Sequence, residues 1–225
     1  MALLHRAELR PSKLDLLAAW LPGRPWFAGA PDAEVTRVAA YRFDDPAGEV
    51  GIETMLVRAG DGPVLQVPLT YRGAPLAGAE PWLVGTTDHS ALGPRWVYDA
   101  CGDPVYPPAL AAAVLADAGQ AEEYFEVDGR REVRAPSMTL AGTRSGSPSA
   151  FDLVDEVVDG DPTLIRAGGA ELALVRRPAP AEAAAPARLT GSWAGQADPV
   201  LLAYARWPFA DGPAPADRPR PTGAH

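Results

Sequence analysis

The first clear pattern of apolar positions is helical and lies near the N-terminus. Leucines recur three or four positions apart between Ser12 and Leu21, which places their side chains on one face of a helix. Ser12 is a favourable N-cap residue, and Asp15, three positions later, is an acidic partner for a capping box. The pair Pro22-Gly23 ends the pattern. The sequence therefore predicts a helix over residues 12–21.

Strand-like apolar stretches follow this helix. They span residues 34–43, 49–58 and 63–72, and the segments between them are rich in Asp, Gly and Pro. Short strands joined by short turns indicate an antiparallel meander. We expect the helix to pack on one face of this sheet.

A second strand-rich region lies after an alanine-rich helix. Shorter strands at residues 82–84 and 95–98 lead to this helix, which is predicted over residues 109–117 and follows Pro107-Pro108. The later strands are predicted at residues 123–127, 132–141, 150–158, 163–167 and 171–177, with glycine-rich breaks between most of them. Residues 189–193 and 199–207 are expected to form a last ordered pair of segments. This pattern predicts a second sheet.

The order of elements predicts an α+β fold with two antiparallel-sheet subdomains. The first is expected over residues 1–118 and the second over residues 119–207. The second contains an Ala- and Pro-rich linker, residues 178–187. Residues 208–225 form a Pro-rich tail that we expect to be disordered.

Charge and composition narrow the classes of partner. The chain of 225 residues has a net charge of −9, so nucleic acid and anionic membrane surfaces are not expected partners. No apolar run approaches the ~20 residues that span a bilayer. The N-terminus lacks the pattern of a secretory signal, and the single cysteine, Cys101, allows no internal disulfide. We expect a cytoplasmic protein.

Segments of the first half resemble the N-terminal cap of the bacterial maltokinases. The residues that carry the resemblance are Trp20 to Gly29 (WLPGRPWFAG), Val64 to Arg72 (VLQVPLTYR), Val84 to His89 (VGTTDH) and Leu92 to Ala100 (LGPRWVYDA). They occur in the family's order over about the first hundred residues. The resemblance implies that the first subdomain is cystatin-like, with a helix packed on a curved sheet. The region to about Arg177 resembles the family's intermediate subdomain, the start of a kinase N-lobe.

The same resemblance implies a phosphoryl transfer that this chain is not equipped to perform by itself. The family phosphorylates maltose, and such chemistry needs a strand lysine for the nucleotide, a catalytic Asp loop and an Asn for the metal. The lysine position corresponds to Ala173, and the only lysine is Lys13, on the first helix. The chain has no Asn, none of its three histidines precedes Asp by two residues, and it stops where the helical lobe is expected. We expect no catalytic residue, no cofactor and no metal site.

The candidate ligand-binding residues lie in the segment of strongest resemblance. Asp88, His89, Arg95 and Asp99 bring together charged and titratable groups that could line a binding surface. The structural alternative is that Arg95 and Asp99 pair with each other. Cys101 could be a nucleophile served by His89, although a lone cysteine is more often a small buried hydrophobe.

Two further features have both a binding and a structural interpretation. The Gly/Ser-rich loop at residues 142–149 could hold an anion through its backbone amides, or could be an ordinary hairpin loop. Aromatic residues of the first subdomain could form a sugar platform, but aromatic clusters more often pack in cores. These aromatics are Trp20, Trp26, Phe27 and Trp82.

The functional prediction is a non-catalytic interaction or regulatory module linked to α-glucan or trehalose metabolism. Its expected partner is an unidentified protein, and a homodimer is possible. One alternative is a small-molecule or glucan-binding module. Another is a component of a split sugar kinase that acts with a separate catalytic lobe, and a third is an unrecognised enzyme that uses His89, Asp99 or Cys101.

One strand indicates where a partner could bind. Residues 171–177 are apolar on both faces, and such a strand needs cover on both sides. Residues 189–207 could supply that cover by folding back. The competing explanations are a dimer or another protein.

Overall fold

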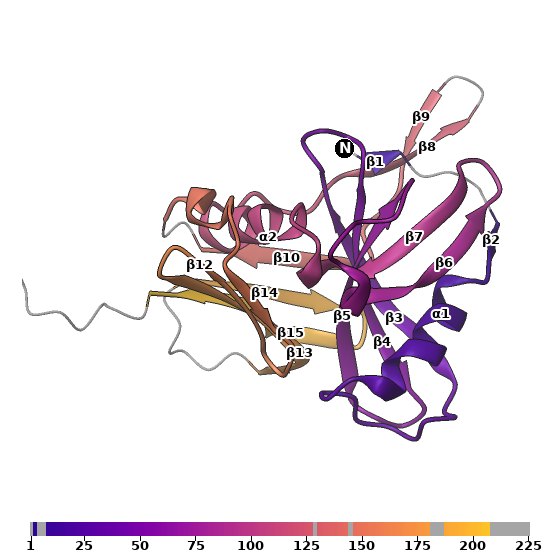
Figure 1. Ribbon diagram of the computed structural model, residues 1–225, viewed down its shortest axis with the longest axis horizontal. Helices are drawn as coiled ribbons and strands as arrows, with labels where there is room; N and C mark the ends of the chain where they lie inside the picture. The colour runs from indigo at the N-terminus through magenta and orange to yellow at the C-terminus, as the bar shows by residue number, and fades with distance from the viewer. Residues whose placement is uncertain (1, 4–7, 128–129, 144–145, 181–186, 208–225) are drawn as a thin grey trace, which may run out of the picture.

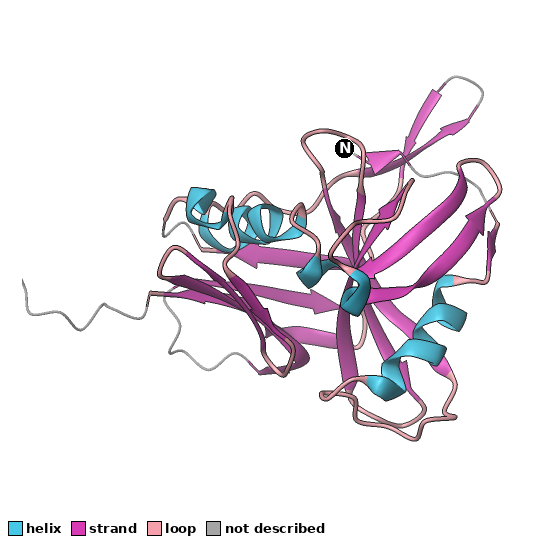
Figure 2. Cartoon of the chain, in the orientation of Figure 1, coloured by secondary structure: helices cyan, strands magenta, loops and turns pink. Residues whose placement is uncertain are grey.

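The computed structural model describes residues 2–3, 8–127, 130–143, 146–180 and 187–207. Two six-stranded sheets, a smaller three-stranded sheet and two α-helices make up this part of the chain (Figures 1 and 2). The predicted α+β class is confirmed. The predicted tail at 208–225 and linker residues 181–186 lie outside the described residues.

The first large sheet has the strand order β2-β6-β7-β5-β4-β3. Its strands are β2 (Leu9–Arg10), β3 (Val35–Phe43), β4 (Gly51–Ala59), β5 (Val64–Arg72), β6 (Leu83–His89) and β7 (Gly93–Asp99). The predicted antiparallel meander of β3, β4 and β5 is confirmed. The next strand in space is β7 rather than β6, because the 73–82 connection, which ends in the short helix η2 (Glu80–Trp82), carries the chain past β7.

Helix α1 (Lys13–Trp20) packs on one face of this sheet and continues into the short helix η1 (Leu21–Gly23). The predicted capping box is present: Ser12 Oγ accepts from Asp15 N at 3.2 Å, and Asp15 Oδ2 accepts from Ser12 N at 3.0 Å. Leu17 of α1 is fully buried in this cluster, which also contains the sheet residues Val57 and Leu65. The expected helix on a curved antiparallel sheet is confirmed.

The second large sheet has the order β10-β14-β15-β13-β12-β11. Its strands are β10 (Met138–Gly142), β11 (Glu156–Val158), β12 (Thr163–Ala167), β13 (Ala170–Pro180), β14 (Ala187–Trp193) and β15 (Gln196–Arg206). Helix α2 (Tyr106–Leu115) packs against β10, β14 and β15. Gly142 permits this approach, since a Cβ there would lie 2.0 Å from the Ala113 carbonyl oxygen.

The two large sheets share one hydrophobic core. Tyr41 and Leu56, on the face of the first sheet opposite α1, belong to the same buried cluster as Leu172 and Leu174 of β13. Residues of α2 belong to that cluster too. The second sheet therefore packs directly on the back of the first, and the predicted boundary at residue 118 stays a prediction.

Residues 189–207 were predicted to cover the strand at residues 171–177 by folding back over it. They form most of β14 and β15, and β15 pairs antiparallel with β13. The segment thus extends the sheet beside β13 instead of lying across its face, and this makes β13 an interior strand.

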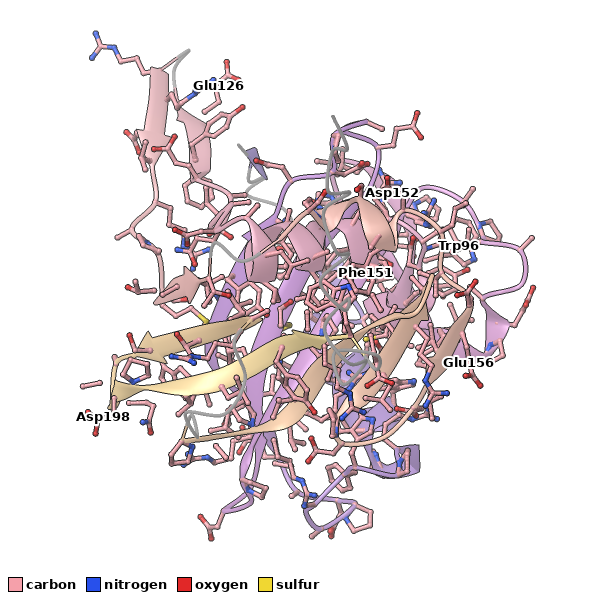
Figure 3. All side chains as sticks on the ribbon, turned by 90° about the vertical axis from the view of Figure 1, so that its left-hand side faces the viewer. Trp96, Glu126, Phe151, Asp152, Glu156 and Asp198 are labelled. Atoms are coloured by element: carbon pink, nitrogen blue, oxygen red, sulfur yellow. The ribbon has the colours of Figure 1, made fainter. Side chains whose placement is uncertain are left out.

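Two local features differ from the sequence-based expectation. A strand was expected over residues 150–158, but the chain forms the short helix η4 (Pro148–Phe151) before β11. Ser147 caps η4 and Pro148 fixes its first turn, which favours a helical start over an extended one. The small sheet combines β1 (Ala2–Leu3), β8 (Glu123–Val127) and β9 (Arg130–Val133), and its β1–β8 pair is parallel. The β8–β9 hairpin, which carries Glu126, projects from the body (Figures 1 and 3).

Candidate functional site

The four predicted ligand-binding residues do not converge. Asp88 and His89 end β6, and Arg95 lies opposite Thr87 on the paired β7, so these three lie around one hairpin. His89 Nδ1 accepts hydrogen bonds from the backbone N–H groups of Ala91 and Leu92 and thereby shapes the turn. Asp99 is at the other end of β7, roughly 13 Å along the strand from Arg95. Ligand binding by these residues stays a prediction.

Asp99 instead forms a buried ion pair with Arg176 of β13. Asp99 Oδ2 lies 2.7 Å from Arg176 Nη2, and the two side chains are 1% and 0% exposed. Arg176 Nε also donates to Thr163 Oγ1 at 2.7 Å, and the guanidinium carbon lies 4.5 Å from the Trp26 ring centroid. The proposed pair of Arg95 with Asp99 is therefore wrong: Arg95 donates to the Pro94 carbonyl at 3.0 Å.

Cys101 lies next to this ion pair and is not set up as a nucleophile. It is 1% exposed, in the short helix η3 (Ala100–Gly102), and its Sγ is 3.5 Å from Arg176 Nη2. Burial and the neighbouring Asp99 carboxylate raise the pKa of the Cys101 thiol well above its ordinary value, which disfavours the reactive thiolate. His89 is at the far end of β7 from Cys101.

Three of the segments used for the family resemblance meet the second sheet. Trp26 Nε1 donates to Asp159 Oδ1 at 2.7 Å, and Asp99 binds Arg176. Gln66 Nε2 donates at 2.9 Å to the carbonyls of both Val175 and Leu202, where the pairing of β13 and β15 is interrupted.

Trp26, Gln66 and Asp99, which lie in segments of the family resemblance, thus form part of the surface against which the second sheet packs. Sequence reasoning missed this role for Gln66, although a polar residue inside the apolar run Val64 to Leu69 is a signal for a buried polar contact.

Ala173, the residue at the family's lysine position, lies in the middle of the second sheet. It is fully buried, with Leu164 of β12 and Tyr204 of β15 as its register partners. The only lysine of the chain, Lys13, begins helix α1, and its ammonium contacts the Glu53 carboxylate of the first sheet and lies 5.0 Å from the Tyr71 ring centroid. Lys13 therefore belongs to a different face of the molecule from β13.

The face of the second sheet that carries Ala173 points away from the shared core, because side chains alternate along a strand. Its side chains form two rows across the strands, and we call it the open face. One row alternates in charge, with Arg166 Nη1 2.6 Å from Glu156, Arg166 Nε 3.1 Å from Glu171, and Arg206 Nε 2.5 Å from Glu171. The neighbouring row is largely apolar and consists of Val158, Leu164, Ala173, Tyr204 and Arg188. Leu164 and Tyr204 are half-buried, so this row is accessible in part.

The remaining candidate features have structural roles where they are described. Trp20 and Trp26 are core residues whose rings meet edge to face at 5.8 Å, in agreement with the core interpretation. Residues 144–145 of the Gly/Ser-rich loop lie outside the described residues, so anion binding there stays a prediction. Among the residues that the structure places, no cluster of His, Cys, Asp or Glu could hold a metal ion. No helix in the same part of the chain could span a membrane.

Comparison with known proteins gives one family match. Residues 20–103 match the family model of the maltokinase N-terminal cap domain. The matched range includes β3 to β7 and ends at Asp103, just before α2. No curated protein matches the chain.

Proposed function

We propose that this chain is a non-catalytic module that binds another protein of α-glucan metabolism. The match of residues 20–103 to the maltokinase N-terminal cap domain supports this metabolic context. The observation that carries the proposal is the composition of β13. The strand where the resemblance puts a nucleotide-binding lysine has a fully buried alanine, Ala173. Its two arginines are committed to contacts within the protein, Arg176 with Asp99 and Arg177 with Asp161.

The open face supports the choice of a protein as the partner. Its largely apolar row, which includes Leu164 and Tyr204, lies beside the row of alternating charges. An apolar centre with a polar, charged rim is the usual composition of a protein–protein interface. The complementary partner surface has an apolar centre and charges of alternating sign along one side.

The purified chain is expected to show no sugar-dependent consumption of ATP. The reason is that none of its residues supplies the lysine, asparagine or catalytic Asp loop that phosphoryl transfer requires. The measurement is ADP release with Mg-ATP and maltose, glucose or glucosamine, compared with a protein-free control. Saturable turnover that one point substitution in this chain abolishes would contradict the proposal.

The Leu164→Glu variant is expected to lose the partner. The substitution places a charge in the apolar row of the open face, and truncation or charging of a central interface residue typically weakens binding tenfold or more. Affinity capture from the native cell, with wild type and variant in parallel, identifies proteins that depend on Leu164. Each is then purified and tested for direct binding.

A matched control is Val133→Glu, because Val133 is an exposed valine on β9, outside the open face. Circular dichroism checks that both variants remain folded. Binding that both variants retain, or both lose while folded, would exclude the open face as the docking surface. Recovery of a second copy of this chain alone would show a homodimer in place of the proposed partner.

A further inference from the structure

A hollow of about 270 Å³ lies between the edge strand β3 and the base of the β8–β9 hairpin. Three segments form it: β3, the connection from α2 to β8, and the connection from β9 to β10. Residues that matter for its chemistry are Arg42, Gln120, Glu123, Val133, Arg134 and Pro136. None of the residues that line the hollow belongs to the open face, so the two sites use different residues.

The walls of this hollow are held in place by hydrogen bonds. Ser137 Oγ accepts from Ala40 N at 2.9 Å and donates to Ala40 O at 2.8 Å, which satisfies both backbone groups of that residue. Ala121 N donates to Arg42 O at 2.8 Å, and Gln120 Nε2 donates to Met138 O at 3.0 Å. The site is thus largely formed before any ligand arrives, as binding pockets usually are.

Two buried polar atoms in the lining have no hydrogen-bond partner among the residues that the structure describes. One is Gln120 Oε1, an acceptor, and the other is Arg42 Nε, a donor. Arg42 Nε lies 3.1 Å from Glu123 Oε1, an ion-pair contact without hydrogen-bond geometry. Buried polar groups are almost always satisfied, and a bound group that accepts one hydrogen bond and donates another would satisfy both atoms. A hydroxyl group does both.

The charges and the apolar residues of the lining further restrict the chemical class of the ligand. The guanidinium groups of Arg42 and Arg134 are balanced by the carboxylates of Glu122 and Glu123, which favours a neutral ligand over an ion. Val133 is 57% exposed and, with Pro136, gives the hollow an apolar side. A ring with hydroxyls on its rim and C–H groups on its face matches both properties.

We propose that this hollow binds a neutral polyhydroxylated ring, either a monosaccharide unit or a cyclic polyol. The volume is just below the range typical of small-molecule pockets, which suits one ring rather than an extended chain. The site is independent of the partner proposed for the open face. It also uses none of the residues Asp88, His89, Arg95 and Asp99.

An NMR titration of the full chain with glucose and with myo-inositol tests the proposal. The expected result is saturable binding with a Kd of about 1 mM for at least one probe, in the range of small polar ligands. The shifts are expected to cluster at residues 120–123 and 133–136. Absence of saturable shifts with both probes, or tighter binding of inorganic phosphate than of either, would overturn the proposal.

Two variants link any binding to the hollow. Val133→Trp fills it, and Gln120→Leu removes the unpartnered acceptor, so each is expected to weaken binding by about tenfold or more. The matched control is Leu153→Trp, since Leu153 is also an exposed apolar residue but lies between η4 and β11, outside both the hollow and the open face. Thermal unfolding verifies that the variants fold. Equal affinity of Val133→Trp and wild type would place the binding elsewhere and contradict the assignment.

Discussion

Replacing Arg176 by methionine is expected to lower the free energy of unfolding by about 3–5 kcal/mol. The substitution keeps much of the side-chain volume but leaves the buried carboxylate of Asp99 without its cation. It also removes the hydrogen bond to Thr163 and the contact with the Trp26 ring. Urea unfolding at neutral pH, followed by circular dichroism, measures the loss.

The neighbouring arginine supplies the control. Arg177 pairs with Asp161 at 2.6 Å, but its side chain is 49% exposed, so Arg177→Met is expected to cost at most about 1 kcal/mol. In the double variant, Asp99→Asn neutralises the carboxylate that Arg176→Met leaves unpaired, and part of the stability is expected to return. Equal costs for Arg176→Met and Arg177→Met would show that the buried pair does not hold the first sheet on the second.

The stability contributed by Glu53 is expected to disappear between about pH 4.5 and pH 2. Burial alone would raise the pKa of this carboxyl, but the charges of Lys13 and Arg42 outweigh it and hold the pKa at about 2. A depressed pKa in the folded state stabilises the fold above the unfolded pKa, and this contribution is lost as the pH falls through the folded pKa. The shift corresponds to on the order of 3 kcal/mol at neutral pH.

The Glu53→Gln variant isolates this contribution from the titration of other carboxyls. At pH 7 it is expected to be less stable than wild type, and the difference should shrink steadily as the pH falls from 4.5 to 2. Glu156→Gln is the control, because the Glu156 side chain is 55% exposed and its ion pair with Arg166 is worth little. A wild-type-minus-Glu53→Gln difference that stays constant over this range would contradict the account of Glu53.

Local patterns in the sequence predicted local structure well. The capping box at Ser12 and Asp15 and the meander of β3 to β5 depend on residues close in sequence, and both are confirmed. β7 lies beside β5 because of the path that the connection 73–82 takes, and the periodicity of apolar residues carries no information about that path. The short helix η4 was missed although its local signals, the cap residue Ser147 and Pro148 in the first turn, are present in the sequence.

The candidate site was harder to predict because its contacts join distant positions. Asp99 and Arg176 are separated by 77 residues, and Gln66 is 136 residues from Leu202. Sequence reasoning singled out Asp99 but assigned it a partner from the same strand, Arg95. The polar character of these residues was visible in the sequence, whereas the packing of one sheet on the other, which pairs them, was not.

The central claim is that this chain acts by binding a protein through the open face of its second sheet. The most direct measurement is the affinity of the purified partner for wild type, Leu164→Glu and Val133→Glu, determined by calorimetry under identical conditions. The account predicts a loss of about tenfold or more for Leu164→Glu and none for Val133→Glu. Equal affinities for all three proteins, or a loss confined to Val133→Glu, would contradict it.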